Sequence, residues 1–152
     1  FGIIFTSPNS DVENYFFQKN IRKFVKYNSN SILINNMGKK IYLSTLKIID
    51  CMIGNSSSGV LESAALKLPV INIGDRQKGR ILTKNVINLK SEFNNKDFKK
   101  KLSIALSLKF KKSLKDIKDP NYIKGCSLKM IKIIKQMDLN RDFAKKFYDV
   151  RF

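Results

Sequence analysis

Histidine and tryptophan are absent from this chain of 152 residues, and cysteine occurs only twice. Without histidine, the chain can carry neither histidine-based acid–base catalysis nor a metal site with histidine ligands. Cys51 and Cys126 are too few for a disulfide framework and lack the spacing of a metal site, so they favour a reduced, cytosolic protein without a metal. Cys51 lies in an apolar run and is expected to be a small core residue.

Long apolar segments are also missing. No run approaches the roughly 20 apolar residues that a membrane helix needs, so no membrane partner is expected. The first residues, Phe1–Phe5, lack the basic region of a signal peptide. Because the chain opens within a strand-like apolar run, we expect it to be cut out of a longer chain.

Acidic residues are scarce: 12 Asp and Glu stand against 30 Lys and Arg, which gives a formal net charge of +18. Such an excess can neutralise nucleic-acid phosphates. Nearly all of it is lysine, however, and the lysines are scattered over predicted helix faces. The chain is also rich in Ile, Asn and Phe and poor in Ala, as an AT-rich genome produces. We therefore predict no nucleic-acid partner, although the positive field attracts anionic ligands in general.

The length and the apolar content of 43% suit the core of one domain, or of one lobe of a larger protein. Apolar runs of strand length alternate with segments of helical periodicity. This alternation predicts an α/β fold with a Rossmann-like, mainly parallel sheet and helices on both faces. We expect the lobe to span residues 1–137 and a tail at 138–152 to dock as a last helical turn. The predicted strands are Gly2–Thr6, Ile32–Ile34, Cys51–Ile53, Val70–Ile73 and Asn85–Leu89, and the predicted helices are Val12–Tyr27, Ile41–Ile49, a helix from Val60, Lys96–Leu108 and Cys126–Met137.

Two polar turns follow neighbouring predicted strands. The first, Gly54–Gly59, carries three consecutive serines, and the second, Gly74–Arg80, carries Arg76. Ligands of open α/β sheets bind outside the carboxyl ends of the strands, so both turns should lie on one edge of the sheet. Free N–H groups at the start of a helix, serine hydroxyls and a guanidinium all favour a phosphate. The two turns together predict a nucleotide-diphosphate site.

Each of these residues also has a structural explanation. Glu62, in the first turns of the predicted helix, either accepts hydrogen bonds from ribose hydroxyls or is stabilised by the helix N-terminus by about 0.3–1 kcal/mol. One of the serines could be the N-cap residue, and Arg76 could form a surface ion pair. Their combination on one sheet edge favours the nucleotide site, while both explanations of Glu62 stay open.

These stretches closely resemble the signature of the hydrolysing UDP-N-acetylglucosamine 2-epimerases, enzymes of the sialic acid pathway with bacterial relatives that act on related nucleotide sugars. The resemblance rests on Gly54–Glu62 (GNSSSGVLE) followed by Pro69–Arg80 (PVINIGDRQKGR). The upstream stretch Phe5–Asp11 (FTSPNSD) looks like the strand and turn of the same family. The similarity runs from Phe1 to about Leu108.

The resemblance implies a GT-B-like fold of two Rossmann-type lobes, of which this chain is most of the C-terminal lobe. The serines would contact the diphosphate, the glutamate would hold the ribose, and the arginine would lie by the diphosphate or the closing cleft. The uracil would be held by backbone in the loop Asn36–Gly38. The UDP-binding residues implied in this way are Ser56, Ser57, Glu62, Arg76 and, through its backbone, Met37.

The family reaction is an elimination of UDP across C1 and C2, after which water adds and N-acetylmannosamine or a related sugar results, without a metal or redox cofactor. The residues that take the C2 proton belong to the N-terminal lobe, so we expect no catalytic residue in this chain and no activity of the chain alone. The family commonly forms dimers or tetramers, which makes a homo-oligomer possible. Two alternatives remain: the C-terminal lobe of a GT-B glycosyltransferase and, with less support, a basic polyanion-binding domain.

Overall fold

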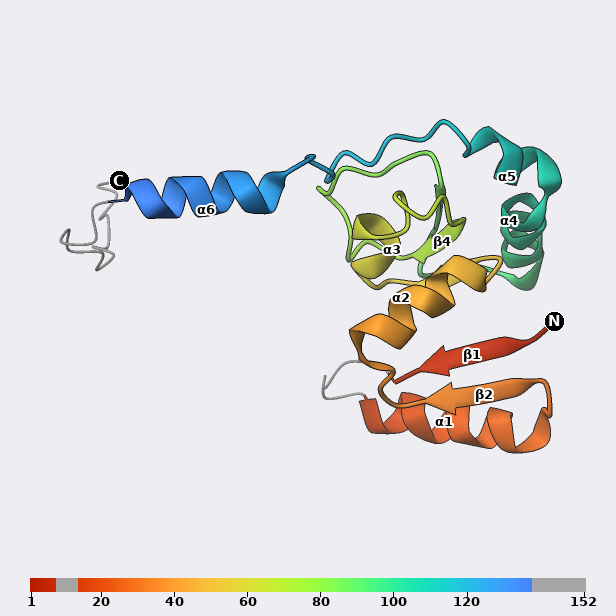
Figure 1. The fold of residues 1–152 in the computed structure, drawn as a ribbon. Coiled ribbons are helices and arrows are strands. Elements are labelled where there is room, and N and C mark those ends of the chain that lie inside the picture. Colours follow the sequence, from red (N-terminus) through yellow and green to blue (C-terminus); the bar gives the residue numbers. More distant parts are fainter. Residues whose placement is uncertain (8–13, 138–152) are drawn as a thin grey trace, which may run out of the picture. The chain divides into compact units, whose positions relative to one another are not determined.

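The computed structural model describes residues 1–7 and 14–137, and the chain divides into two compact units, Phe1–Pro120 and Asn121–Phe152. Strands and helices alternate in the first unit as far as β4, after which β5 follows β4 and α5 follows α4 (Figure 1). Its elements are β1 (Ile3–Thr6), α1 (Asn14–Tyr27), β2 (Ser31–Ile34), α2 (Gly38–Ile48), β3 (Met52–Gly54), α3 (Ser58–Leu61), β4 (Val70–Ile73), β5 (Val86–Leu89), α4 (Asn95–Leu106) and α5 (Leu108–Ser113).

β1 and β2 form a parallel two-stranded sheet in which Ile3 lies opposite Ser31. Successive side chains of a strand point to opposite faces, and the Phe5 side chain points toward α1. Its ring meets the ring of Phe24 edge to face, with 5.7 Å between the centroids. α1 therefore packs on this small sheet, and Figure 1 shows it running along β2.

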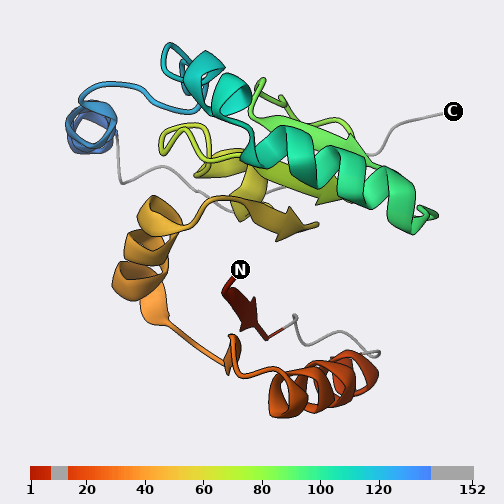
Figure 2. The same cartoon turned by 90° about the vertical axis from the view of Figure 1, so that its right-hand side faces the viewer.

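β3, β4 and β5 form a parallel three-stranded sheet with β4 in the middle. The central strand is the most deeply buried: Val70 and Ile71 expose 2% and 0% of their surface. One face of the sheet packs on α4 through a core cluster of Ile71, Leu89 and Ala105. Figure 2 shows α4 lying alongside these strands.

The opposite face of this sheet meets α3. A Cβ added to Gly59 would lie 3.0 Å from Cγ1 of Val70 and 3.6 Å from the sulfur of Met52. Val70 and Ile71 are neighbours in the strand, so their side chains point to opposite faces. The three-stranded sheet thus has a helix on each face, as the alternating sequence predicts.

The predicted α/β class with parallel strands is confirmed, and each predicted strand lies within two residues of an observed one. The described strands form two parallel sheets, however, where the sequence predicts one. The assignment to the C-terminal lobe of a GT-B-like fold stays a prediction.

α3 is shorter than the sequence predicts. The pattern that begins at Val60 suggests a full helix, but α3 ends at Leu61 and residues 62–67 form turns. Glu62 is consequently the C-cap residue of α3. The helix dipole favours carboxylates at the N-terminal end only, so the structure does not support the dipole explanation of Glu62.

A buried hydrogen-bond network holds the chain just after α3. The hydroxyl of Ser63 donates to the Gly59 carbonyl at 2.6 Å, and such back-bonding competes with the helical ladder. The side-chain amide of Asn85 donates to the Ser63 hydroxyl at 2.8 Å and to the Leu68 carbonyl at 2.7 Å. Ser63 and Asn85 are both fully buried, so this network fixes the chain between α3 and β4.

The remaining helices follow the sequence prediction. α5 follows α4 directly, and its N-cap Ser107 accepts a hydrogen bond from Phe110 N–H at 3.1 Å. The second unit contains α6 (Cys126–Gln136). The tail at 138–152 lies outside the described residues, so the predicted lobe boundary stays a prediction. Within the described ranges, no helix has the length and apolar character to cross a membrane.

Candidate functional site

The two polar turns lie side by side at the carboxyl ends of adjacent parallel strands. β3 and β4 pair with Gly54 opposite Asn72, and each strand runs directly into its turn. A hydrogen bond ties the turns together: Nε2 of Gln77, in the second turn, donates to the carbonyl of Asn55, in the first, at 2.7 Å. The predicted meeting of these turns on one sheet edge is therefore observed.

The serine turn (residues 55–58) presents unused hydrogen-bond donors. Ser57 is the N-cap residue of α3, yet its side chain makes no capping hydrogen bond. The N–H groups of Ser56 and Ser57 have no hydrogen-bond partner in the part of the chain that the structure describes, and both residues are exposed. Capping accordingly does not explain Ser57, and the turn offers two backbone donors to an anion.

The other serine hydroxyls are engaged within the protein. Ser56 Oγ accepts from the Ser58 N–H at 3.3 Å, and Ser58 Oγ accepts from the Tyr42 hydroxyl at 2.8 Å. Tyr42 belongs to α2, so its hydroxyl anchors the serine turn on a second side. The turn is held by α2 through Tyr42 and by the neighbouring turn through Gln77.

Glycine is required at the start of both turns. Gly54 has φ +147° and Gly74 has φ +75°, backbone conformations that side-chain-bearing residues rarely adopt. At Gly74 an added Cβ would also lie 2.7 Å from Oγ of Ser91, so that side chain would have to move. These two glycines let the chain turn sharply where each strand ends.

Glu62 lies one helical turn beyond the serine turn and is half-buried. Its Oε2 atom is buried and has no hydrogen-bond partner among the described residues. A buried carboxylate oxygen without a donor is costly. Glu62 therefore has an unfilled acceptor where the sequence predicts a group that binds hydroxyls.

Arg76 is exposed in the turn that Gln77 ties to the serine turn. Lys111 and Asp50 form an ion pair, whereas Arg76 has no ion-pair partner among the described residues. The surface ion pair considered as an alternative explanation for Arg76 is thus absent from the described structure. Its guanidinium is available to an anion.

Met37 directly precedes α2, the helix whose Tyr42 reaches the serine turn. It is the half-buried N-cap residue of that helix, and the following Gly38 N–H donates to Oδ1 of Asn36 at 2.8 Å. Within the described ranges, no hydrogen bond joins Met37 itself to the serine turn; the connection is made farther along α2 by Tyr42.

Sequence reasoning missed Gln77 and Tyr42. Tyr42 sits within an amphipathic helix, where a tyrosine is ordinarily read as part of the apolar face. Gln77 is 2% exposed although it lies in a polar loop, and no periodic pattern marks a buried loop residue. The resemblance stretch contains Gln77, which is the one signal that could have directed attention to it.

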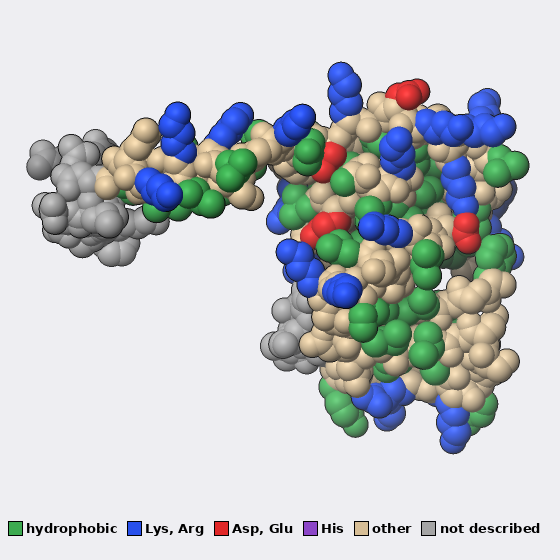
Figure 3. All heavy atoms as spheres, in the orientation of Figure 1, with side chains coloured by type: hydrophobic (Ala, Val, Ile, Leu, Met, Phe, Trp, Pro, Cys, Tyr) green, Lys and Arg blue, Asp and Glu red, His purple; other side chains and the backbone are tan. Residues whose placement is uncertain are grey.

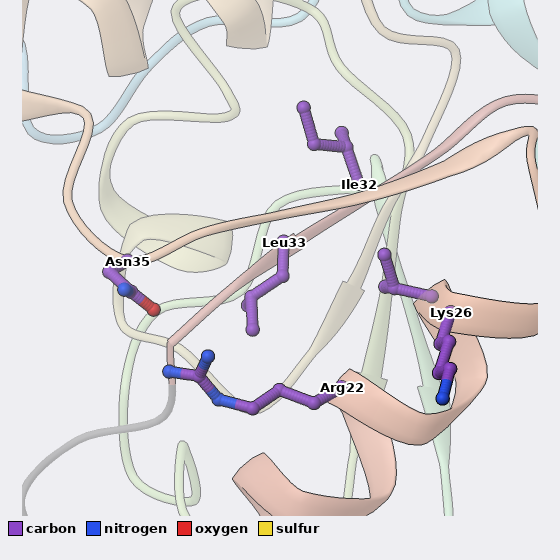
Figure 4. Close-up of a pocket in the computed structure, with 6 residues that line it drawn as sticks. Arg22, Lys26, Ile32, Leu33 and Asn35 are labelled. Carbon is purple, nitrogen blue, oxygen red and sulfur yellow. The ribbon is translucent and has the colours of Figure 1, made fainter.

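A cavity of about 390 Å³ lies elsewhere, between α1 and β2. In Figure 4 the Arg22 side chain extends toward Asn35 along this hollow. None of the predicted site residues lines it, so this cavity is separate from the two tied turns. Its lining residues are Arg22, Val25, Lys26, Ile32, Leu33 and Asn35.

Two other kinds of group, the Cys51 thiol and clusters of acidic residues, add no second site within the described ranges. Burial raises the pKa of the Cys51 thiol to about 11, so Cys51 stays protonated and packs against the core cluster as predicted. The described residues hold no group of three or more Asp, Glu or Cys that could bind a metal. Lys and Arg side chains are dispersed over the face in Figure 3, with few acidic side chains between them.

The chain matches the model of a known protein family. The family described as UDP-N-acetylglucosamine 2-epimerase matches residues 1–135, a range that contains every residue of the two tied turns. The match therefore covers the whole of the candidate site.

Individual relatives agree with the family match. The GDP/UDP-N,N'-diacetylbacillosamine 2-epimerase (hydrolyzing) of Campylobacter jejuni is 45% identical over 97 residues, which are 63% of this chain and 25% of that protein. The polysialic acid biosynthesis protein P7 of Escherichia coli is 33% identical over 149 residues, 97% of this chain and 37% of that protein. The UDP-N,N'-diacetylbacillosamine 2-epimerase (hydrolyzing) of Legionella pneumophila is 34% identical over 87 residues, 57% of this chain and 23% of that protein. The chain thus spans about a quarter to a third of the length of these relatives.

Proposed function

The chain belongs to the UDP-N-acetylglucosamine 2-epimerase family, and from this premise we propose that it is the nucleotide-diphosphate-binding part of a hydrolysing 2-epimerase. The substrate class is UDP-N-acetylglucosamine or a related UDP- or GDP-sugar. Two of the relatives carry the word hydrolyzing in their names, which supports the reaction type. No feature of the described residues favours the glycosyltransferase alternative.

The observation that carries the proposal is the pair of turns joined by Gln77. The N–H groups of Ser56 and Ser57 and the guanidinium of Arg76 have no partner among the described residues, and they belong to turns that one hydrogen bond holds together. Backbone donors and a guanidinium suit the oxygens of a diphosphate. The buried, unpaired Oε2 of Glu62 suits the hydroxyls of the attached ribose.

In the proposed reaction these groups serve the leaving nucleotide. The C2 proton is removed, the bond from C1 to the diphosphate oxygen breaks, and a C1=C2 double bond forms. The electron pair of the broken bond stays on the diphosphate, where the Ser56 and Ser57 N–H groups and Arg76 stabilise the added negative charge. Water then adds its hydroxyl to C1 and a proton to C2 on the opposite face, which inverts C2 and gives an N-acetylmannosamine-type sugar.

The proton-transfer groups belong to another part of the enzyme in this proposal. The relatives are three to four times as long as the stretch that this chain spans. We accordingly assign the removal of the C2 proton to residues outside this sequence and expect the 152-residue chain to bind nucleotide without turning over substrate.

Isothermal titration of the chain with UDP tests the proposed function. We expect UDP to bind more tightly than uridine, because only UDP engages the serine turn and Arg76. Circular dichroism on the same sample shows that the chain is folded. A folded chain that fails to bind UDP at millimolar concentration, or that binds uridine as tightly as UDP, contradicts the proposal.

A further inference from the structure

We propose that Gln77 is a positioning residue of the diphosphate site, because its side-chain amide holds the Asn55–Ser56 peptide with the Ser56 N–H directed at the ligand. The inference rests on the proposed function, since it assigns a role within the same site. It goes further by naming the residue that sets the geometry of the serine turn.

The burial of Gln77 is the first observation. Its neighbours Arg76 and Lys78 are exposed, as loop residues usually are, whereas Gln77 is 2% exposed. Glutamine is seldom fully buried, and buried amides normally make hydrogen bonds. Here the bond runs from Nε2 to the Asn55 carbonyl at 2.7 Å, across 22 positions of sequence.

Because of the geometry of the peptide unit, this hydrogen bond also fixes the direction of an N–H group that can donate to the ligand. The carbonyl of Asn55 and the N–H of Ser56 belong to one planar peptide, and in a trans peptide they point in opposite directions. The described residues contain no cis peptide. By holding the Asn55 carbonyl, Gln77 therefore directs the Ser56 N–H away from itself, and that N–H has no partner within the described ranges.

Loss of the bond would release this peptide. Nothing else in the described structure accepts the Ser56 N–H, so the peptide could rotate and present its carbonyl oxygen to the site. A carbonyl oxygen beside a diphosphate oxygen is repulsive, whereas an N–H in the same place is attractive. The bond from Gln77 thus selects the anion-binding orientation.

The carbonyl end of the Gln77 side-chain amide shows which property the side chain at this position must have. Its Oε1 atom is buried without a hydrogen-bond partner among the described residues. Only the donor end of the amide is used, so the site requires a side chain of this length that donates a hydrogen bond and carries no negative charge. Methionine has the length but no donor, and glutamate has the length but a carboxylate that only accepts.

The test compares Gln77→Met with the wild-type chain by isothermal titration. We expect the affinities for UDP and for inorganic pyrophosphate to fall roughly tenfold, as for the loss of one hydrogen bond to a charged group. The affinity for uridine should stay within about twofold, because uridine has no phosphate. Gln136→Met is the matched control, since Gln136 is exposed on α6, and it should change none of the three affinities.

The outcomes separate the inference from the proposed function. Undiminished UDP binding by Gln77→Met, or an equal loss of UDP and uridine, overturns the positioning role alone. A wild-type chain that binds neither UDP nor pyrophosphate overturns the proposed function and this inference with it. If Gln77→Met does not fold, Gln77→Leu, which also lacks a donor and adds no charge, gives the same comparison, and failure of both variants to fold makes Gln77 a structural residue and overturns the proposal.

Discussion

At the scale of single residues, the structure removes one of the two explanations that the sequence offers for Glu62. The sequence leaves two explanations open, ribose binding and stabilisation by a helix N-terminus. The structure ends α3 at Leu61, so the carboxylate stands at the wrong end of the helix for the dipole to favour it. What remains is an acceptor atom, Oε2, that is buried and unpaired among the described residues.

Replacing this carboxylate should therefore weaken the binding of the nucleoside part of the ligand and leave the binding of the phosphates unchanged. For Glu62→Ala we expect the affinities for UDP and uridine to fall together by about tenfold or more, the value of hydrogen bonds to a charged group. Inorganic pyrophosphate, which has no ribose, should bind as it does to the wild-type chain. Titration with the three ligands measures this, and Glu92→Ala, at an exposed position, is the control. An equal loss of pyrophosphate binding would remove the ribose role.

The residues of the site differ in how far sequence could reveal them. Ser56, Ser57 and Arg76 follow apolar runs directly, so strand ends and turn composition were enough to place them on one sheet edge. Gln77 and Tyr42 act through partners 22 and 16 positions away. Their roles depend on tertiary contacts, which neither periodicity nor local composition encodes.

At the scale of elements, the strands were predictable and the length of α3 was not. Short apolar runs bounded by polar turns mark buried parallel strands wherever they occur. The chain just after α3 is held instead by Asn85, whose side chain donates to the Ser63 hydroxyl from 22 positions away. A contact between residues so far apart in sequence is invisible to a local pattern.

The same network predicts a large effect on stability. Asn85 is fully buried, donates to Ser63 and Leu68, and accepts from the Thr83 hydroxyl. Its removal leaves those partners unsatisfied in the core, so Asn85→Ala should lower the free energy of unfolding by about 2–4 kcal/mol. Urea denaturation followed by circular dichroism measures this.

A matched control makes the same asparagine-to-alanine change at an exposed position. Asn95 is exposed at the start of α4, and Asn95→Ala should change the free energy of unfolding by less than about 0.5 kcal/mol. Similar losses in the two variants would mean that the buried network does not stabilise the fold.

At the scale of the whole molecule, the net charge of +18 acts on every anion. Lys and Arg side chains are dispersed over the face in Figure 3, so we expect their contribution to UDP binding to be a long-range field and not a set of contacts. Fields between exposed charges are screened by salt: the screening length falls from about 30 Å at 0.01 M ionic strength to about 8 Å at 0.15 M. Contacts within a site are screened much less.

This difference gives the last prediction. Raising the ionic strength from about 0.01 M to about 0.15 M should weaken UDP binding several-fold and leave uridine binding unchanged, because salt screens the long-range field of the lysines. UDP should still bind more tightly than uridine, because the N–H groups of Ser56 and Ser57 and the guanidinium of Arg76 still contact the diphosphate. Single-stranded nucleic acid, titrated in parallel, should bind only weakly at the higher salt, in the range of non-specific Kd values of about 10⁻⁴–10⁻⁶ M. If nucleic acid instead bound more tightly than this at the higher salt and UDP lost its advantage over uridine, the basic surface rather than the tied turns would be the functional feature of this chain.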